Sequence, residues 1–144
     1  MRARCALAVA LATTLALSQA ACAGMGAAGD FERFGGMPGI RAVVEDAIVR
    51  SVEDPRIAHH FAGANLVRLH DKLSEQICVE LGGPCVYTGF PMAQAHAGRD
   101  IREADFNALV EHLVEAMEAH AVPRPAQNRL LARLARMRGD VIER

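Results

Sequence analysis

Residues 82–101 read GGPCVYTGFPMAQAHAGRDI, and this stretch decides the fold. His96 lies in it among small or flexible neighbours, with alanine at positions 93, 95 and 97 and glycine at position 98. Small residues around one imidazole let a flat and bulky group approach closely. The alternative is a surface histidine in a loose loop, and the surrounding residues have to decide between the two.

A short helix over residues 92–97 would place the Met92 carbonyl one turn before His96, within reach of a ring N–H. That hydrogen bond would fix the tautomer and leave the other ring nitrogen free for a metal. Haem iron needs one such nitrogen and no second protein ligand. A lone histidine is more often structural or exposed, so the haem hypothesis depends on this helical context.

The chain beyond residue 30 has helical periodicity throughout, and no segment alternates long enough for a strand. Apolar positions at helical spacing predict four amphipathic helices, over 40–48, 66–81, 106–117 and 130–141. Pro38 opens the first, Asn65 caps the second, and a capping box of Asp100 and Glu103 starts the third. The sequence therefore predicts an all-α domain.

The composition leaves this domain short of large core side chains. Aromatic residues make up 4% of the chain and Trp is absent. A buried apolar cofactor would supply the missing surface between the helices.

The amino terminus has the layout of a signal peptide, with Arg2 and Arg4, an apolar run over 5–17, and small residues before Cys22. The run is too short and too Ala-rich for a membrane span. Cleavage after residue 20 would suit ordinary signal peptidase, whereas residues 20–22 resemble a lipobox that would lipidate Cys22. We expect the lipoprotein form, although Gln19 stands where a lipobox prefers an aliphatic residue.

The predicted organisation is a signal peptide over 1–22, a flexible Gly/Ala linker over 23–30 and one domain over 31–144. We expect the protein to be exported to the periplasm and anchored to the membrane through Cys22. Without Arg2 and Arg4 the 16 basic residues fall to 14 against 17 acidic ones, a net charge near −3. This balance gives no indication of a nucleic-acid partner.

Two of the four cysteines, Cys78 and Cys85, lie in the predicted domain and are spaced C-x6-C. With no second pair and no histidine in register, they make a poor zinc site. An oxidising periplasm favours a disulfide across the Gly-Gly turn, worth roughly 2–3 kcal/mol by loop entropy. Two reduced, buried cysteines are the alternative for a cytosolic protein.

Residues from Phe31 to about Ile142 resemble the group I truncated haemoglobins. The matching segments are FERFGGMPGIRAVVED (31–46), DPRIAHHFAG (54–63), LGGPCVYTG (81–89), PMAQAHAGRDI (91–101) and ADFNALVEHLVEAM (104–117). They occur in the family's order and with its spacing, and they cover nearly all of the expected mature chain.

The resemblance implies a globin-like two-over-two helical sandwich around haem b, with His96 as the iron ligand. Phe61 falls on the position that packs against the haem face. Met92, Ile101 and Phe106 fall on proximal and haem-edge contacts, and Tyr87 and Arg99 on contacts to the haem propionates, with Lys72 a weaker candidate. The distal helix contributes the apolar contacts Leu66, Leu69 and Leu73.

The distal side departs from the family pattern. Many members place a Tyr and a Gln where this chain has Ile48 and Leu73, and the usual distal position is Leu69. O2 becomes partly negative on binding and gains more from a polar donor than CO or NO does. One lost donor, at about 1–3 kcal/mol, predicts roughly five- to hundredfold weaker O2 retention. We therefore expect a fast O2 off-rate, or a preference for NO or CO.

Other polar side chains are candidates for the missing hydrogen-bond donor to a bound gas. Gln76, one turn beyond Leu73, is an alternative donor or a lining residue of a gas tunnel. His70 diverges from Leu69 by about 100°, so we expect it to face solvent or the haem edge. The neighbours His59 and His60 make a weak metal pair, and a zinc site between His112 and His120 is improbable.

The leading hypothesis is a haem-binding globin that reversibly binds a diatomic gas (O2, NO or CO), with a reductase as a further partner. A second is a periplasmic haem redox protein or enzyme acting on NO, nitrite or peroxide. The absence of an evident distal acid–base group weighs against the second. A third is a helical interaction module without haem, which leaves His96 and Phe61 unexplained.

Overall fold

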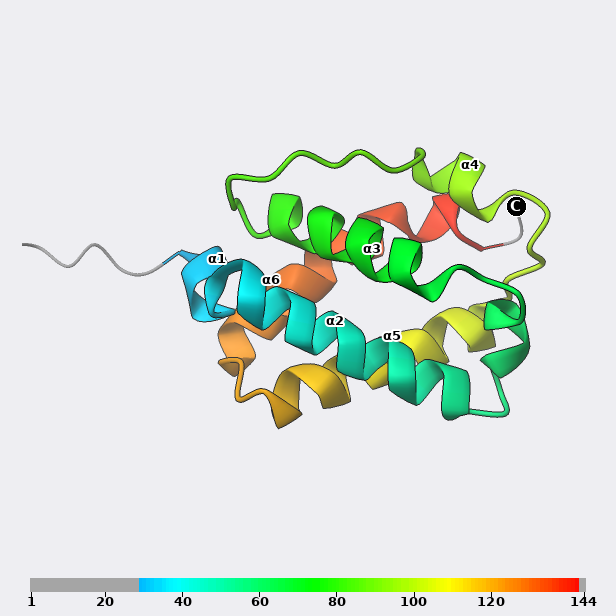
Figure 1. Cartoon of the computed structure of the whole chain (residues 1–144), viewed down its shortest axis with the longest axis horizontal. Coiled ribbons are helices and arrows are strands. Elements are labelled where there is room, and N and C mark those ends of the chain that lie inside the picture. Colours follow the sequence, from blue (N-terminus) through cyan, green and yellow to red (C-terminus); the bar gives the residue numbers. More distant parts are fainter. Residues whose placement is uncertain (1–28, 143–144) are drawn as a thin grey trace, which may run out of the picture.

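The structure is a computed structural model that describes residues 29–142, so the predicted signal peptide and Cys22 lie outside the described residues (Figure 1). Every regular element in this range is helical, which confirms the all-α prediction. The elements are α1 (Asp30–Arg33), α2 (Gly36–Glu53), η1 (Ala58–Phe61), α3 (Leu66–Glu80), α4 (Met92–His96), α5 (Glu103–Ala119), α6 (Arg124–Leu134) and η2 (Ala135–Asp140), where η marks a 3-10 helix. None of the helices within 29–142 has the length and apolar character that crossing a bilayer requires.

Helix α3 begins and ends where local sequence signals place its limits. The Asn65 side chain accepts a hydrogen bond of 2.9 Å from the backbone N–H of Arg68, which confirms the predicted N-cap. Beyond the helix, Gly82 adopts a left-handed φ of 77°, and the N–H of Gly83 donates to the Cys78 carbonyl at 2.8 Å. Each end of the helix is therefore closed by a hydrogen bond between residues that are only three or five positions apart in the sequence.

Several predicted boundaries differ from those of the structure. Helix α5 is not capped by Asp100, because that residue has a left-handed φ of 49° and an N-cap needs an extended backbone. The helix begins at Glu103, and the backbone N–H of Arg102 donates to the Asp105 carboxylate at 2.9 Å.

The last predicted helix, expected to run to residue 141, ends at Leu134 and continues as the 3-10 helix η2. Tighter 3-10 turns are common where a helix ends. The first helix starts at Gly36, ahead of Pro38, and α1 includes Asp30, which had been assigned to the linker.

The buried core lies at the α1 end of the molecule. Helix α2 packs against both α3 and α5, and α6 packs against α3 (Figure 1). Most of the fully buried apolar residues come from α2, the carboxyl halves of α3 and α5, and α6; Ile57 before η1 and Ala108 in the amino half of α5 are also buried. They include Ile40, Val43, Val44, Ile77, Cys78, Ala116, Met117, Ala126 and Leu130.

The opposite end of the molecule carries α4, the amino ends of α3 and α5, and η2 (Figure 1). Several apolar side chains there are only half-buried and do not pack against the core cluster. They are Phe61, Met92, Ile101, Phe106, Val110 and Met137. This end therefore holds apolar surface that the protein does not cover completely.

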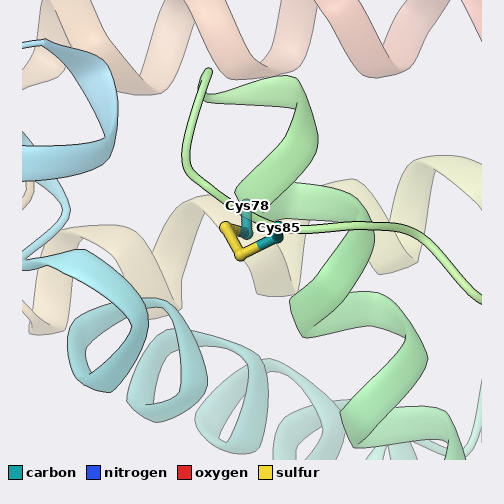
Figure 2. The surroundings of a disulfide bond; sticks show 2 residues. All are labelled: Cys78 and Cys85. Carbon is teal, nitrogen blue, oxygen red and sulfur yellow. A yellow bond between two sulfur atoms is a disulfide. The ribbon is translucent and has the colours of Figure 1, made fainter.

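A disulfide joins Cys78, in the last turn of α3, to Cys85 in the following loop (Figure 2). The two Cα atoms are 6.0 Å apart. Cys78 is fully buried, and Cys85 is half-buried and packs against the core cluster. The predicted pairing of these two cysteines is confirmed.

Gly39, in the first turns of α2, allows the chain before the helix to fold back closely on it. A Cβ at this position would lie 1.8 Å from the carbonyl oxygen of Phe34, which is backbone and cannot swing aside. By contrast, a Cβ on Gly139 in η2 would meet nothing within 4 Å.

We expect Gly39→Ala to lower the free energy of unfolding by about 3 kcal/mol, because the α1–α2 junction must shift to relieve the overlap. Gly139→Ala is the matched control and should change that free energy by less than about 0.5 kcal/mol. Urea denaturation followed by circular dichroism measures both variants. Equal midpoints for Gly39→Ala and the parent protein would contradict the close contact.

Candidate metal centre

The ring of His96 is oriented by its own helix. Its Nδ1 lies 2.8 Å from the carbonyl oxygen of Met92, as predicted from the spacing. A carbonyl only accepts, so Nδ1 carries the proton and the lone pair is on Nε2. Within residues 29–142, no side chain or backbone group bonds to this Nε2. The half-buried imidazole therefore presents one free ligand atom.

A protein-only metal site is not available to complete the coordination. In the part of the chain that the structure describes, no three His, Cys, Asp or Glu side chains gather so that they could hold an ion. A metal on His96 therefore needs its other ligands from a bound group, as iron in a porphyrin does.

The uncovered apolar end described above fits such a group. Phe61 comes from η1, Met92 from α4, and Phe106 from α5, so the half-buried apolar side chains belong to three separate elements. Burying these side chains under a bound group would contribute a favourable free energy of about 25 cal/mol for each Å² of apolar surface removed from water. One free imidazole nitrogen beside exposed apolar surface is the donor set and environment that haem requires.

The predicted distal residues lie on one row of α3 and on α2. Leu69 and Leu73 are half-buried and pack against the core cluster, and Ile48 is 7% exposed. Leu66, in the first turn of α3, is 39% exposed and forms the outer end of this row. No side chain in the set is polar.

A neighbouring row of α3 faces α2 and carries the polar groups. His70 Nε2 lies 3.0 Å from the Arg41 carbonyl on α2, and its side chain remains 22% exposed. That His70 faces solvent or the haem edge stays a prediction. Ser74, four residues on, is fully buried and its hydroxyl has no partner among residues 29–142. Because His70, Ser74 and Cys78 are four residues apart, they share this face and not that of Leu69 and Leu73.

Gln76 is engaged with the carboxyl-terminal segment. Its side-chain amide donates to the Met137 sulfur at 3.2 Å. Both residues line a cavity of about 310 Å³, together with Tyr87, Met92 and neighbouring residues of α3 and η2. The structure thus places Gln76 against η2 and beside Met92, one turn beyond Leu73 on α3.

The three polar residues predicted near the propionates have partners of their own. The Tyr87 hydroxyl donates to the Phe90 carbonyl at 2.8 Å, and burial raises the pKa of this phenol. Lys72 binds Glu75 at 2.7 Å and also the Thr88 hydroxyl. The Nε of Arg99 donates to the Ala95 carbonyl at 2.8 Å.

Tyr87 and Arg99 are not brought together. Arg99 lines a separate cavity of about 670 Å³ with the side chains of Arg56, His59, His60, Arg102 and Asp105. His60 Nε2 lies 3.1 Å from the Asp105 carboxylate. The pKa of that carboxyl is lowered first by the Arg102 N–H and then by His60.

The remaining histidines pair with separate carboxylates. His112 is buried and its Nε2 lies 2.8 Å from Asp54, whereas His120 lies 3.8 Å from Asp46. His59 stacks on His60 with ring centroids 4.0 Å apart. The contacts of His112, in α5, and of His120, directly after it, join this part of the chain to Asp54, which follows α2, and to Asp46 within α2.

Glu75 is a residue whose importance the sequence analysis missed. One carboxylate oxygen accepts from the backbone N–H and the hydroxyl of Thr88, each at 2.9 Å, and the other binds Lys72. Lys72 first, and then Thr88, lower the pKa of Glu75 to about 2 from an ordinary value of 4.5. The Lys-x-x-Glu spacing was the only signal, because Thr88 reaches Glu75 only in the folded chain.

Comparisons with known proteins agree with this arrangement. A family model described as bacterial-like globin matches residues 30–143. The group 1 truncated hemoglobin GlbN of Mycolicibacterium paratuberculosis is 35% identical over 111 residues, which cover 77% of this chain and 82% of the relative. The GlbN of Nostoc commune is 30% identical over 114 residues, covering 79% of this chain and 97% of the relative.

Solved structures show the same fold. The truncated hemoglobin from Tetrahymena pyriformis in its Fe(III) form superposes with a TM-score of 0.77 at 23% identity, over 81% of this chain and all of that chain (100%). The 2/2 hemoglobin from Synechococcus sp. PCC 7002, with covalently attached heme, superposes with a TM-score of 0.74 at 20% identity, over 81% and 100% of the two chains.

The fold and the single imidazole ligand together define a truncated globin. The chain belongs to the bacterial-like globin family, as a group I truncated haemoglobin. Haem iron is the cofactor of this family, and the free Nε2 and the uncovered apolar surface fit it.

We expect Glu75→Gln to destabilise the protein at pH 7, because the folded state holds the pKa of Glu75 below its unfolded value. This contribution is complete above pH 4.5 and disappears as the pH falls from 4.5 to about 2, where the carboxyl becomes protonated in both states. Free energies of unfolding measured against pH should therefore converge for the two proteins in that window.

Glu53→Gln removes an exposed carboxylate of α2 and is the control for charge alone; at pH 7 it should change the free energy of unfolding by less than about 0.5 kcal/mol. A constant difference between Glu75→Gln and the parent from pH 7 to pH 2 would show that the carboxylate does not act through its charge.

Proposed function

We propose that this protein reversibly binds a small diatomic gas at a haem held by His96. Haem iron with one imidazole ligand supplies an open coordination position for such a gas. The observation that carries the proposal is the Nε2 of His96, which has no partner among residues 29–142, on a ring oriented by the Met92 carbonyl at 2.8 Å.

Different residues of the chain contribute to haem binding in different ways. The Met92 carbonyl holds the proton on Nδ1 and prevents the ring from turning. Phe61, Ile101 and Phe106, all half-buried, supply apolar contacts to the faces and edge of the group. Arg99 is available for a carboxylate, because only its Nε is engaged with the protein.

The distal residues set the choice of gas. Ile48, Leu69 and Leu73 offer no hydrogen-bond donor, and Gln76 and His70 are bonded elsewhere. O2 depends on such a donor more than CO or NO does, so the pocket favours rapid O2 release, or NO and CO over O2.

Turnover of peroxide or nitrite is the less favoured alternative. Such reactions need a group that transfers protons at the reacting atoms. The three candidate distal side chains Ile48, Leu69 and Leu73 do not titrate.

Export and lipidation at Cys22 remain predictions from residues 1–22, which lie outside the described residues. The Cys78–Cys85 disulfide supports an oxidising compartment, since such bonds are rare in the cytosol. A reductase that keeps the iron ferrous is an expected partner of a gas-binding globin.

We expect the purified protein to take up haemin with a sharp Soret band, and His96→Ala to weaken haem binding by more than about 100-fold, because it removes the only protein ligand. Absorption titration with haemin measures both. His59→Ala, which removes an exposed imidazole, should bind haemin like the parent. A parent protein that stays colourless would overturn the proposal.

We expect Leu73→Gln to slow O2 dissociation by roughly five- to hundredfold, because an amide donor at this position is worth about 1–3 kcal/mol. CO dissociation should change much less. Leu73→Met, which conserves volume without adding a donor, is the matched control. Stopped-flow displacement of O2 gives the rates; slow release by the parent, unaltered in Leu73→Gln, would contradict the apolar-pocket model.

A further inference from the structure

The loop over residues 82–91 connects the two walls of the proposed haem site. It leaves the carboxyl end of α3, the distal helix, and leads directly into α4, which carries His96 (Figure 1). Helix α4 has only five residues, and η2 is the element against which it packs most. The position of His96 therefore depends on how firmly the preceding loop is held.

The loop is tied to α3 at two points. Its first half is joined covalently, because Cys85 is bonded to the fully buried Cys78 (Figure 2). Its middle is held by Glu75, which accepts from the N–H and hydroxyl of Thr88 at 2.9 Å. Both ties end on the carboxyl half of α3, the part of that helix that belongs to the dry core.

Between these ties and α4 the loop closes on itself. The Tyr87 hydroxyl donates to the Phe90 carbonyl at 2.8 Å, immediately before Pro91 and the first residue of α4. The connection from the core to His96 thus runs from Cys78 through the disulfide, the Glu75–Thr88 contact and the Tyr87–Phe90 contact.

We propose that the Cys78–Cys85 bond and Glu75 are positioning groups for His96, which keep the proximal imidazole at a fixed place opposite the distal helix and so retain haem. The inference rests on the proposed haem-binding function. Neither group touches the haem site; each acts through the loop.

The physical basis is the entropy of the connection. With both ties in place, only residues 89–91 separate the held part of the loop from α4. Without them the free connection extends over 82–91, and α4 samples more positions because a longer loop closes at a greater entropic cost. The imidazole then spends less time at the iron, and haem leaves faster.

The same connection makes haem retention sensitive to thiol redox state. An external dithiol that opens the bond transfers two electrons and two protons to the cysteine pair, leaving two thiols on the protein and a disulfide on the dithiol. The half-buried Cys85 sulfur is the accessible point of attack, because Cys78 is fully buried. We expect the reduced form to release haem faster than the oxidised form.

The experiment measures haem transfer from the ferric holoprotein to an excess of apomyoglobin. The double variant Cys78→Ala/Cys85→Ala should lose haem about tenfold faster than the parent. The loop-closure entropy of the disulfide limits the largest possible increase in this rate to roughly hundredfold. Glu75→Gln, which leaves the core intact, should lose it about two- to fivefold faster. The Soret spectra should match the parent, because His96 remains the ligand.

One control variant separates positioning from general stability. Leu130→Ala truncates a fully buried residue of α6, away from the loop, and should destabilise the fold while leaving haem transfer within about twofold of the parent. If Leu130→Ala releases haem as fast as the loop variants do, the effect is one of global stability and the inference is wrong.

Parent-like transfer rates for both Glu75→Gln and the folded double variant would also overturn it. Should the double variant fail to fold, Glu75→Gln alone decides, with circular dichroism verifying its fold. A parent protein that binds no haem would refute the proposed function instead, so the two failures are distinguishable.

Discussion

The helices leave several apolar side chains at the α4 end of the molecule only half-buried. Binding of an apolar group at this end depends on that incomplete burial. The helices converge at the α1 end, where α2, α3, α5 and α6 bury a dry core. Toward the other end Phe61, Met92 and Phe106 stay half-exposed to water. A flat apolar group between them completes their burial, and the free Nε2 of His96 gives that group a fixed orientation.

Two kinds of interaction hold this open end in shape. The Met92–His96 hydrogen bond lies within one helical turn and forms as soon as α4 does. The disulfide and the Glu75–Thr88 contact join segments that are separated in the chain and secure the loop to α3. The Met92–His96 hydrogen bond orients the imidazole ring, and we infer that the two ties between the loop and α3 fix the position of that ring in the fold.

Local signals predicted the structure well wherever the partners are near in sequence. The Asn65 cap, the glycine turn after α3 and the orientation of His96 are all contacts over three to five residues. Prediction was wrong where a residue's conformation depends on the path of the chain. Asp100 adopts a left-handed backbone in the connection to α5, so that helix begins at Glu103 instead. That backbone conformation is not encoded within one turn of Asp100.

The sequence by itself predicted the helical class, the disulfide pairing, the candidate imidazole and the apolar side chains of the candidate distal residues, because spacing and side-chain chemistry are properties of the chain. Only the tertiary structure decided which polar groups are available at the site. Gln76 and Lys72 could each have served gas or haem by their chemistry, yet Gln76 contacts the Met137 sulfur and Lys72 the Thr88 hydroxyl, both on other segments of the fold. A hydrogen bond forms between groups that packing brings within about 3 Å, and that proximity belongs to the folded chain.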